Sequence, residues 1–94
     1  MLKIGRMESQ TRDAVRDAIA SIVRDVLRRQ DVTIADSTTA GEVAGWDSLA
    51  HVNIVLGVEK RFCIRFKAAE VARIDNVGTM VDLVLTRAPR GPAA

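Results

Sequence analysis

Apolar side chains in residues 8–30 recur with the period of an α-helix. They stand on one face, at Val15, Ile19, Ile22, Val23, Val26 and Leu27. Arginine and aspartate residues alternate on the other sides of the segment, and Ser9 or Thr11 can cap its start. The pattern predicts an amphipathic helix over residues 8–30.

Residues 31–47 lose this period and contain two glycines among many Asp, Ser and Thr residues. This composition predicts a long loop. Such a loop is uncommon in a small domain, where it tends to be functional or packed by its own side chains. Four apolar residues can fasten it to a core: Val32, Ile34, Val43 and Trp46.

Helical periodicity returns in the second half of the chain. We expect a helix from Ser48 to about Arg61, with Asp47 as its N-cap, and a brief helix near Lys67–Arg73. A last helix is expected over Val77–Arg87. Its inward-facing residues should be Met80, Val81, Val84 and Leu85.

These elements predict an all-α fold, a small four-helix bundle with three main helices and one short helix. The long loop follows the first helix. Residues 8–88 should form this single domain, with a flexible N-terminus at residues 1–7 and a disordered tail at residues 89–94. We find no repeat and no internal linker.

The composition of the 94 residues excludes several classes of protein. Hydrophobic residues make up 48% of the chain, but aromatic residues only 3%, so a folded core must be mainly aliphatic. The apolar runs are too short to cross a bilayer, and the first residues do not resemble a signal peptide. Cys63 is the only cysteine, which excludes an internal disulfide and fits a reducing cytoplasm. One His and one Cys cannot build a typical structural zinc site, so we expect no metal.

The formal net charge is +2, and residues 48–94 carry 7 basic and 4 acidic side chains. A nucleic-acid module would have to use the basic residues Arg24, Arg28, Arg29, Lys60, Arg61, Arg65 and Lys67. They are interleaved with acids, and aromatic stacking platforms are nearly absent. We therefore expect no nucleic-acid partner.

The stretch Gly45-Trp46-Asp47-Ser48-Leu49 places a serine at the start of a predicted helix. With Asp47 as the cap, Ser48 is the first helical residue, near unpaired backbone N–H groups and the positive end of the helix dipole. That position favours a bound or attached anion, phosphate above all. The alternative is that Asp47 and Ser48 are ordinary capping residues.

The helix after the serine carries two apolar stripes. Ile54, Val55, Val58 and Phe62 form a broad stripe that can face the core. Leu49, Val52 and Leu56 form the second stripe, roughly opposite the first. The second stripe is either covered, in a central helix buried on most sides, or exposed beside the serine as a docking site.

The chain resembles the acyl carrier protein family from about residue 8 to residue 87. The resemblance is strongest in DSLAHVNIVLGVEKRFCIRF, from Asp47 to Phe66, and is supported by DNVGTMVDLV at Asp75–Val84. It implies that Ser48, within the Asp47–Leu49 motif, is the attachment site of phosphopantetheine. A phosphopantetheinyl transferase would deliver this cofactor from coenzyme A, and its thiol would hold an acyl group as a thioester.

The resemblance further implies a non-catalytic, monomeric carrier that works with acyl-loading and acyl-processing enzymes. These partners would dock on Leu49, Val52 and Leu56. The pathway would be fatty-acid-like, polyketide or other secondary-metabolite biosynthesis. A peptidyl or aminoacyl carrier is an alternative, although Trp46-Asp47 does not match the Gly-Gly-x-Ser typical of that class.

The chain departs from the family pattern in charge and at one turn. Asn53 stands where the family often has Glu, and Lys60-Arg61 replaces what is often an acidic pair. The acidic face that attracts basic synthase enzymes is therefore largely missing, which indicates a specialised carrier. Cys63 stands where glycine often suits a left-handed residue at a helix end.

Two rival functions use the same residues. In a hydrolase, Ser48 and His51 would approach across one helical turn, but the sequence supplies no nucleophile elbow and no evident oxyanion hole. A small helical adaptor would use the apolar stripe without any modification of Ser48.

Overall fold

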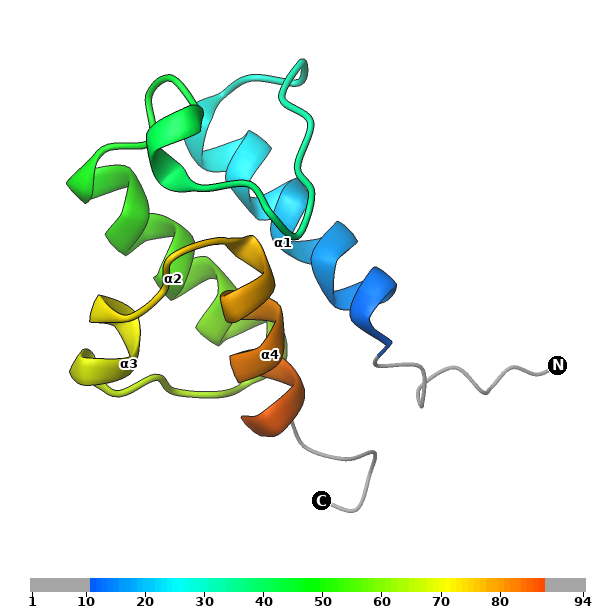
Figure 1. The fold of residues 1–94 in the computed structure, drawn as a ribbon, viewed down its shortest axis with the longest axis vertical. Helices are drawn as coiled ribbons and strands as arrows, with labels where there is room; N and C mark the ends of the chain where they lie inside the picture. The colour runs from blue at the N-terminus through cyan, green and yellow to red at the C-terminus, as the bar shows by residue number, and fades with distance from the viewer. Residues whose placement is uncertain (1–10, 88–94) are drawn as a thin grey trace, which may run out of the picture.

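The computed structural model of the protein describes residues 11–87. Within this range the chain forms four α-helices, one 3₁₀ turn and no strand. The helices are α1 (Arg12–Leu27), α2 (Ser48–Phe62), α3 (Ala68–Ala72) and α4 (Val77–Arg87). The predicted all-α bundle of three main helices and one short helix, with a long loop after the first, is confirmed (Figure 1). None of these helices combines the length and the apolar character needed to cross a membrane.

The start of α1 is fixed by Thr11, one of the two expected caps. Its side-chain oxygen accepts a hydrogen bond from the Ala14 N–H at 3.1 Å. The other expected cap, Ser9, lies outside the described residues. So do the flexible N-terminus expected at residues 1–7 and the disordered tail expected at residues 89–94.

The end of α1 comes earlier than predicted, at Leu27 instead of residue 30. Arg28 adopts the left-handed conformation, with φ 58°, and the Arg29 N–H donates to the Arg24 carbonyl at 3.0 Å. This hydrogen bond closes a Schellman-type end. Glycine usually occupies the left-handed position, so an arginine there gave no signal in the sequence.

The other helices lie close to their predicted bounds. α2 begins at Ser48 with Asp47 as its N-cap, as predicted, and ends one residue later than expected. α3 is one residue shorter at each end than predicted, and α4 has its predicted bounds. After α2, Cys63 takes the left-handed conformation, with φ 55°, so the turn keeps the backbone that glycine would suit and a cysteine adopts it.

The core lies between α1, α2 and α4. α1 packs against both other helices, and Gly57 of α2 allows a close approach, because a Cβ there would meet the Ile22 methyl at 2.9 Å. The side chains that are almost completely buried are aliphatic or Met: Val15, Ile19, Val23, Ile54, Val58, Val77, Met80, Val81 and Val84. The expected mainly aliphatic core is confirmed, and Leu85, also expected inside, is partly buried against it.

The loop between α1 and α2 is packed by its own side chains. It returns alongside α1 before reaching the 3₁₀ turn Ala40–Glu42 and the start of α2 (Figure 1). Ile34 and Trp46 are buried, each 8% exposed, and Val32 and Val43 pack against the core. All four predicted fastening residues therefore contact the core.

Backbone hydrogen bonds join this loop to the start of α4. The Val77 N–H donates to the Thr38 carbonyl at 2.9 Å, and the Gly78 N–H donates to the Asp36 carbonyl at 2.7 Å. These carbonyls satisfy N–H groups that a helix start leaves without partners. The contact requires a small residue, because a Cβ on Gly78 would lie 3.1 Å from the Asp36 oxygen.

Arginines of α1 hold the same loop through their side chains. Arg12 binds Asp36 at 2.8 Å and also binds Asp82 of α4, and Arg16 binds Asp36 at 3.3 Å. Arg24 donates to the Val32 carbonyl at 3.0 Å. The hydrogen bond from Arg12, with that from Arg16, holds the pKa of Asp36 below its ordinary value.

This lowered pKa predicts an acid-dependent loss of stability. A carboxylate whose pKa is depressed on folding stabilises the protein above its unfolded pKa, and the contribution disappears as the pH falls through the folded pKa. The Asp36→Asn variant should therefore be less stable than the wild type at neutral pH, and the difference should shrink below about pH 4. Urea denaturation of both proteins between neutral pH and acid pH measures this difference in the free energy of unfolding.

The matched control is Asp25→Asn, which removes an exposed carboxylate of α1 that forms no ion pair within the described residues. Its effect should be small at every pH. A difference between wild type and Asp36→Asn that stayed constant from neutral to acid pH would show that the ion pairs of Asp36 do not stabilise the fold.

Candidate functional site

A sharp turn before α2 separates a buried tryptophan from an exposed serine. Gly45 has φ 93°, a left-handed conformation that suits glycine, and its carbonyl accepts the Asp47 N–H at 2.9 Å. Trp46 then enters the core, whereas Asp47 and Ser48 are exposed. The turn therefore displays Ser48 directly beside an anchored residue.

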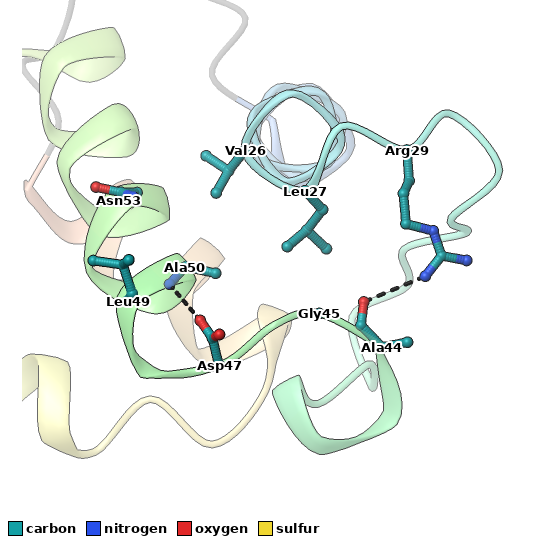
Figure 2. Close-up of a pocket in the computed structure, with 9 residues that line it drawn as sticks. All are labelled: Val26, Leu27, Arg29, Ala44, Gly45, Asp47, Leu49, Ala50 and Asn53. Carbon is teal, nitrogen blue, oxygen red and sulfur yellow. Dashed lines mark hydrogen bonds between the residues drawn. The ribbon is translucent and has the colours of Figure 1, made fainter.

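Asp47 fixes the first turn of α2 from two sides. Its carboxylate accepts the Ala50 N–H at 2.9 Å (Figure 2), and its carbonyl accepts the His51 N–H at 2.8 Å. Ser48 is consequently the first helical residue, as predicted. Its exposed hydroxyl lies at the positive end of the helix dipole, where an attached or bound anion is favoured.

A depression of about 400 Å³ lies on the α1 side of this turn (Figure 2). Figure 2 shows Leu49 and Asn53 of α2 opposite Val26 and Leu27 of α1. Arg29 stands at its edge and donates to the Ala44 carbonyl at 3.3 Å. The loop and α1 therefore form one wall of the depression, and α2 forms the other.

Arg29 also forms an ion pair with Asp31 at 3.1 Å. The hydrogen bond from Arg29 lowers the pKa of Asp31, so the two side chains stay paired at neutral pH. With Arg24 bound to the Val32 carbonyl, two of the basic residues considered for nucleic-acid binding hold the loop instead.

A second depression, of about 480 Å³, lies on the other side of the serine. Its lining residues are Ala40, Trp46, Asp47, Ser48, His51 and Val52. Ser48 lines this second depression and not the first. A group attached to Ser48 would therefore start at the edge of a hollow that also contains the imidazole of His51.

The second apolar stripe of α2 is exposed. Leu49 is 70% exposed, and Val52 and Leu56 are each 51% exposed. The residues of the first stripe face the core, with Ile54, Val55 and Val58 buried and Phe62 partly buried. Of the two alternatives, the helix buried on most sides is wrong, because no element within residues 11–87 covers the stripe.

The two carboxylates at α2 both accept hydrogen bonds from backbone N–H groups. Asp47 caps the helix, and Glu59 accepts the Phe66 N–H at 2.7 Å, which fixes the turn after α2. Asn53, Lys60 and Arg61 are exposed, and the two basic side chains form no ion pair within residues 11–87. The accessible charge on this helix is therefore mainly positive.

The imidazole of His51 is bound to tryptophan. The Trp46 Nε1–H donates to His51 Nδ1 at 3.1 Å, and no hydrogen bond joins Ser48 to His51 in the described part of the chain. The Ser–His pair of the hydrolase hypothesis is therefore not formed. The hydrogen bond between Trp46 and His51 was not predicted from the sequence. A signal for it exists, because a buried indole N–H needs an acceptor and His51 follows Trp46 by five residues.

Comparison with solved structures finds a close structural match. The solution NMR structure of a holo acyl carrier protein from Geobacter metallireducens superposes with a TM-score of 0.73 at 32% sequence identity. The match covers 78% of this chain and 84% of the other. No protein-family model matches the chain, and no curated protein sequence matches it significantly.

The division of α2 into a buried and an exposed face predicts that two similar substitutions lower the free energy of unfolding by very different amounts. Ile54→Ala removes a fully buried side chain and should lower the free energy of unfolding by about 2–5 kcal/mol. Leu56→Ala, two residues away, removes an exposed side chain and should change it by no more than about 0.5 kcal/mol. Urea denaturation of both variants measures this. A large loss in Leu56→Ala would place that residue in the core.

Proposed function

Because the chain belongs to the acyl carrier protein family, we propose that Ser48 carries a phosphopantetheine arm, bound through a phosphodiester. Membership of this family makes the chain a carrier that works with biosynthetic enzymes and not an enzyme itself. The arm supplies a thiol on which acyl groups are held as thioesters. The observation that carries the proposal is the exposed hydroxyl of Ser48 at the capped start of α2.

The residues around Ser48 fit a phosphodiester. Its negative charge would lie at the positive end of the α2 dipole, near first-turn N–H groups. Ser48 is accessible to a phosphopantetheinyl transferase, because Trp46 is directed into the core and Ser48 is exposed among residues 11–87. Ser48 supplies only the attachment oxygen, and Asp47 keeps the helix start in place.

The exposed stripe of Leu49, Val52 and Leu56 is the proposed docking surface for the transferase and for acyl-loading and acyl-processing enzymes. It begins next to Ser48 and runs along α2. Apolar side chains that stand together on an exposed face are typical of a binding site, whereas single exposed apolar residues are not. A partner that covers this stripe would bring its active site towards the attachment point.

We further propose that this carrier serves a specialised pathway, of the polyketide or fatty-acid-like kind, in the cytoplasm. The support is the charge of α2, where Asp47 and Glu59 bind backbone N–H groups and Lys60 and Arg61 are exposed. Enzymes that recognise an acidic carrier would find little of the negative surface that they use for steering.

The attachment site is tested by intact mass after incubation with coenzyme A and a broad-specificity phosphopantetheinyl transferase. The wild type should gain one phosphopantetheine, and Ser48→Ala should gain none while keeping its thermal unfolding midpoint. Ser37→Ala is the matched control, because Ser37 is another exposed serine, in the loop. Modification of Ser48→Ala, or an unmodified wild type, would contradict the proposal and favour the adaptor function.

The specialised role is tested by acyl loading with a malonyl transferase of a housekeeping fatty-acid synthase. The wild type should load poorly even in its holo form. The triple variant Asn53→Glu, Lys60→Glu and Arg61→Glu should load better at low salt, mainly through a faster association. The gain should fall as the ionic strength rises, because salt screens exposed charges.

Efficient loading of the wild type at low salt, with no gain in the triple variant, would show that the charge of α2 does not select partners. The control makes the same change of charge away from α2. Arg28→Glu, Gln30→Glu and Arg73→Glu alter exposed side chains that form no ion pair within residues 11–87, so this variant should load no better than the wild type.

A further inference from the structure

The hydrogen bond between Trp46 and His51 fixes which imidazole nitrogen carries a proton. The indole nitrogen can only donate, so His51 Nδ1, 3.1 Å from it, must accept and cannot be protonated. In neutral imidazole the proton then lies on Nε2. The structure therefore defines the tautomer of His51 and makes Nε2–H a hydrogen-bond donor.

The ring orientation of His51 is also restricted. The two ring centroids lie 6.1 Å apart, with their planes tilted by 30°, and the indole itself is held in the core at 8% exposure. His51 is only partly buried, and its Nε2 forms no hydrogen bond within residues 11–87. Nε2–H is therefore a donor without an acceptor among the described residues.

Ser48 is a neighbour of His51 on α2. His51 follows Ser48 by three residues, a spacing that places two side chains side by side on a helix. Both residues line the depression of about 480 Å³ between α2 and the 3₁₀ turn. The donor and the attachment oxygen therefore belong to the same hollow.

We propose that His51 binds the arm attached to Ser48, by donating its Nε2–H to a phosphodiester oxygen. This inference rests on the proposed attachment at Ser48. Trp46 is a positioning residue in it, because its indole N–H occupies Nδ1 and leaves Nε2–H free to donate. Hydrogen bonds to charged acceptors are stronger than those between neutral groups, so one such bond can orient the first part of the arm.

The orientation has a consequence for the arm. A phosphodiester held by His51 would start on the side of the 3₁₀ turn, in the depression that Ser48 lines, and not in the depression between α1 and α2. The exposed side chains of Leu49 and Leu56 would then stay accessible to a partner. The rival explanation is that His51 only satisfies the buried indole N–H.

Two substitutions of His51 separate its role as acceptor for Trp46 from its role as donor to the arm. One keeps an acceptor at the Nδ1 position, and the other keeps a donor at the Nε2 position. In His51→Asn the amide oxygen lies near the position of Nδ1, so it can accept from Trp46, but no donor remains at the Nε2 position. In His51→Gln the longer amide reaches the Nε2 position with a donor and leaves Trp46 without an acceptor at the Nδ1 position. Asn53→Ala is the control, since Asn53 is an exposed polar residue of α2 that lies outside the apolar stripe and lines the other depression.

The readouts are the ³¹P chemical shift of the holo protein, the indole N–H chemical shift of Trp46 and the thermal unfolding midpoint. Full-length protein is loaded from coenzyme A and checked by intact mass. His51→Asn should keep the midpoint and the indole signal but move the ³¹P signal, by more than Asn53→Ala does. His51→Gln should lower the midpoint and move the indole signal, with a ³¹P shift closer to the wild type than that of His51→Asn.

A second measurement uses the wild type alone. The ¹⁵N signal of His51 Nε2 should show a protonated nitrogen in the apo protein and should move when the arm is attached. A ³¹P signal that is the same in the wild type and His51→Asn, with an unmoved Nε2 signal, would leave His51 as the partner of Trp46 only and overturn the inference. If intact mass shows no arm on the wild type, the attachment at Ser48 fails, and this inference fails with it.

Discussion

The indole of Trp46 attaches the long loop to the helical core at the point where α2 begins. The chain enters this point through Gly45 in a left-handed conformation and leaves it through the Asp47 cap. Because Trp46 is buried and its N–H is satisfied by His51, the next two residues have little freedom to turn inwards. The exposure of Ser48 is thus a consequence of burying its second neighbour. The two depressions beside the serine are formed by the same short segment, since Trp46 lines one and its neighbour Gly45 lines the other.

Much of the fold follows from patterns within the sequence, and the parts that do not follow depend on contacts between distant residues. Helical periodicity located α2 and α4 to within one residue, because caps and apolar stripes are local signals. The end of α1 was missed because Arg28 adopts a left-handed conformation without the glycine that usually marks it. The ion pairs of Asp36 with Arg12 and Arg16 join the loop to α1 across 20 or more residues, and no periodicity encodes them.

In the candidate site, too, some features follow from neighbouring residues in the sequence and others depend on distant contacts. Ser48 at a capped helix start follows from the order of Gly45, Asp47 and the apolar stripes, because each of these acts on its neighbours. The exposure of Leu49, Val52 and Leu56 could not be predicted from the sequence, because a helix with two apolar stripes can also be a central helix buried on most sides. Only the packing of α1 and the core against one side of α2 decides between them. Likewise, no local pattern in the sequence shows that Glu59 binds the Phe66 N–H in the turn after α2.

A carrier must bring one attached group to several active sites, and the structure indicates which part of the molecule provides the movement. Ser48, the proposed attachment residue, lies on a helix start fixed by Asp47, by the buried Trp46 and by a loop that α1 arginines hold at several points. An oxygen placed in this way cannot move far relative to the stripe on α2. In the proposed holo form, the reach of the cargo must therefore come from the arm, whereas the protein sets where the arm begins and which surface a partner meets. Tethering then raises the local concentration of the acyl group at each partner, because docking on the rigid stripe limits the volume that the arm has to search.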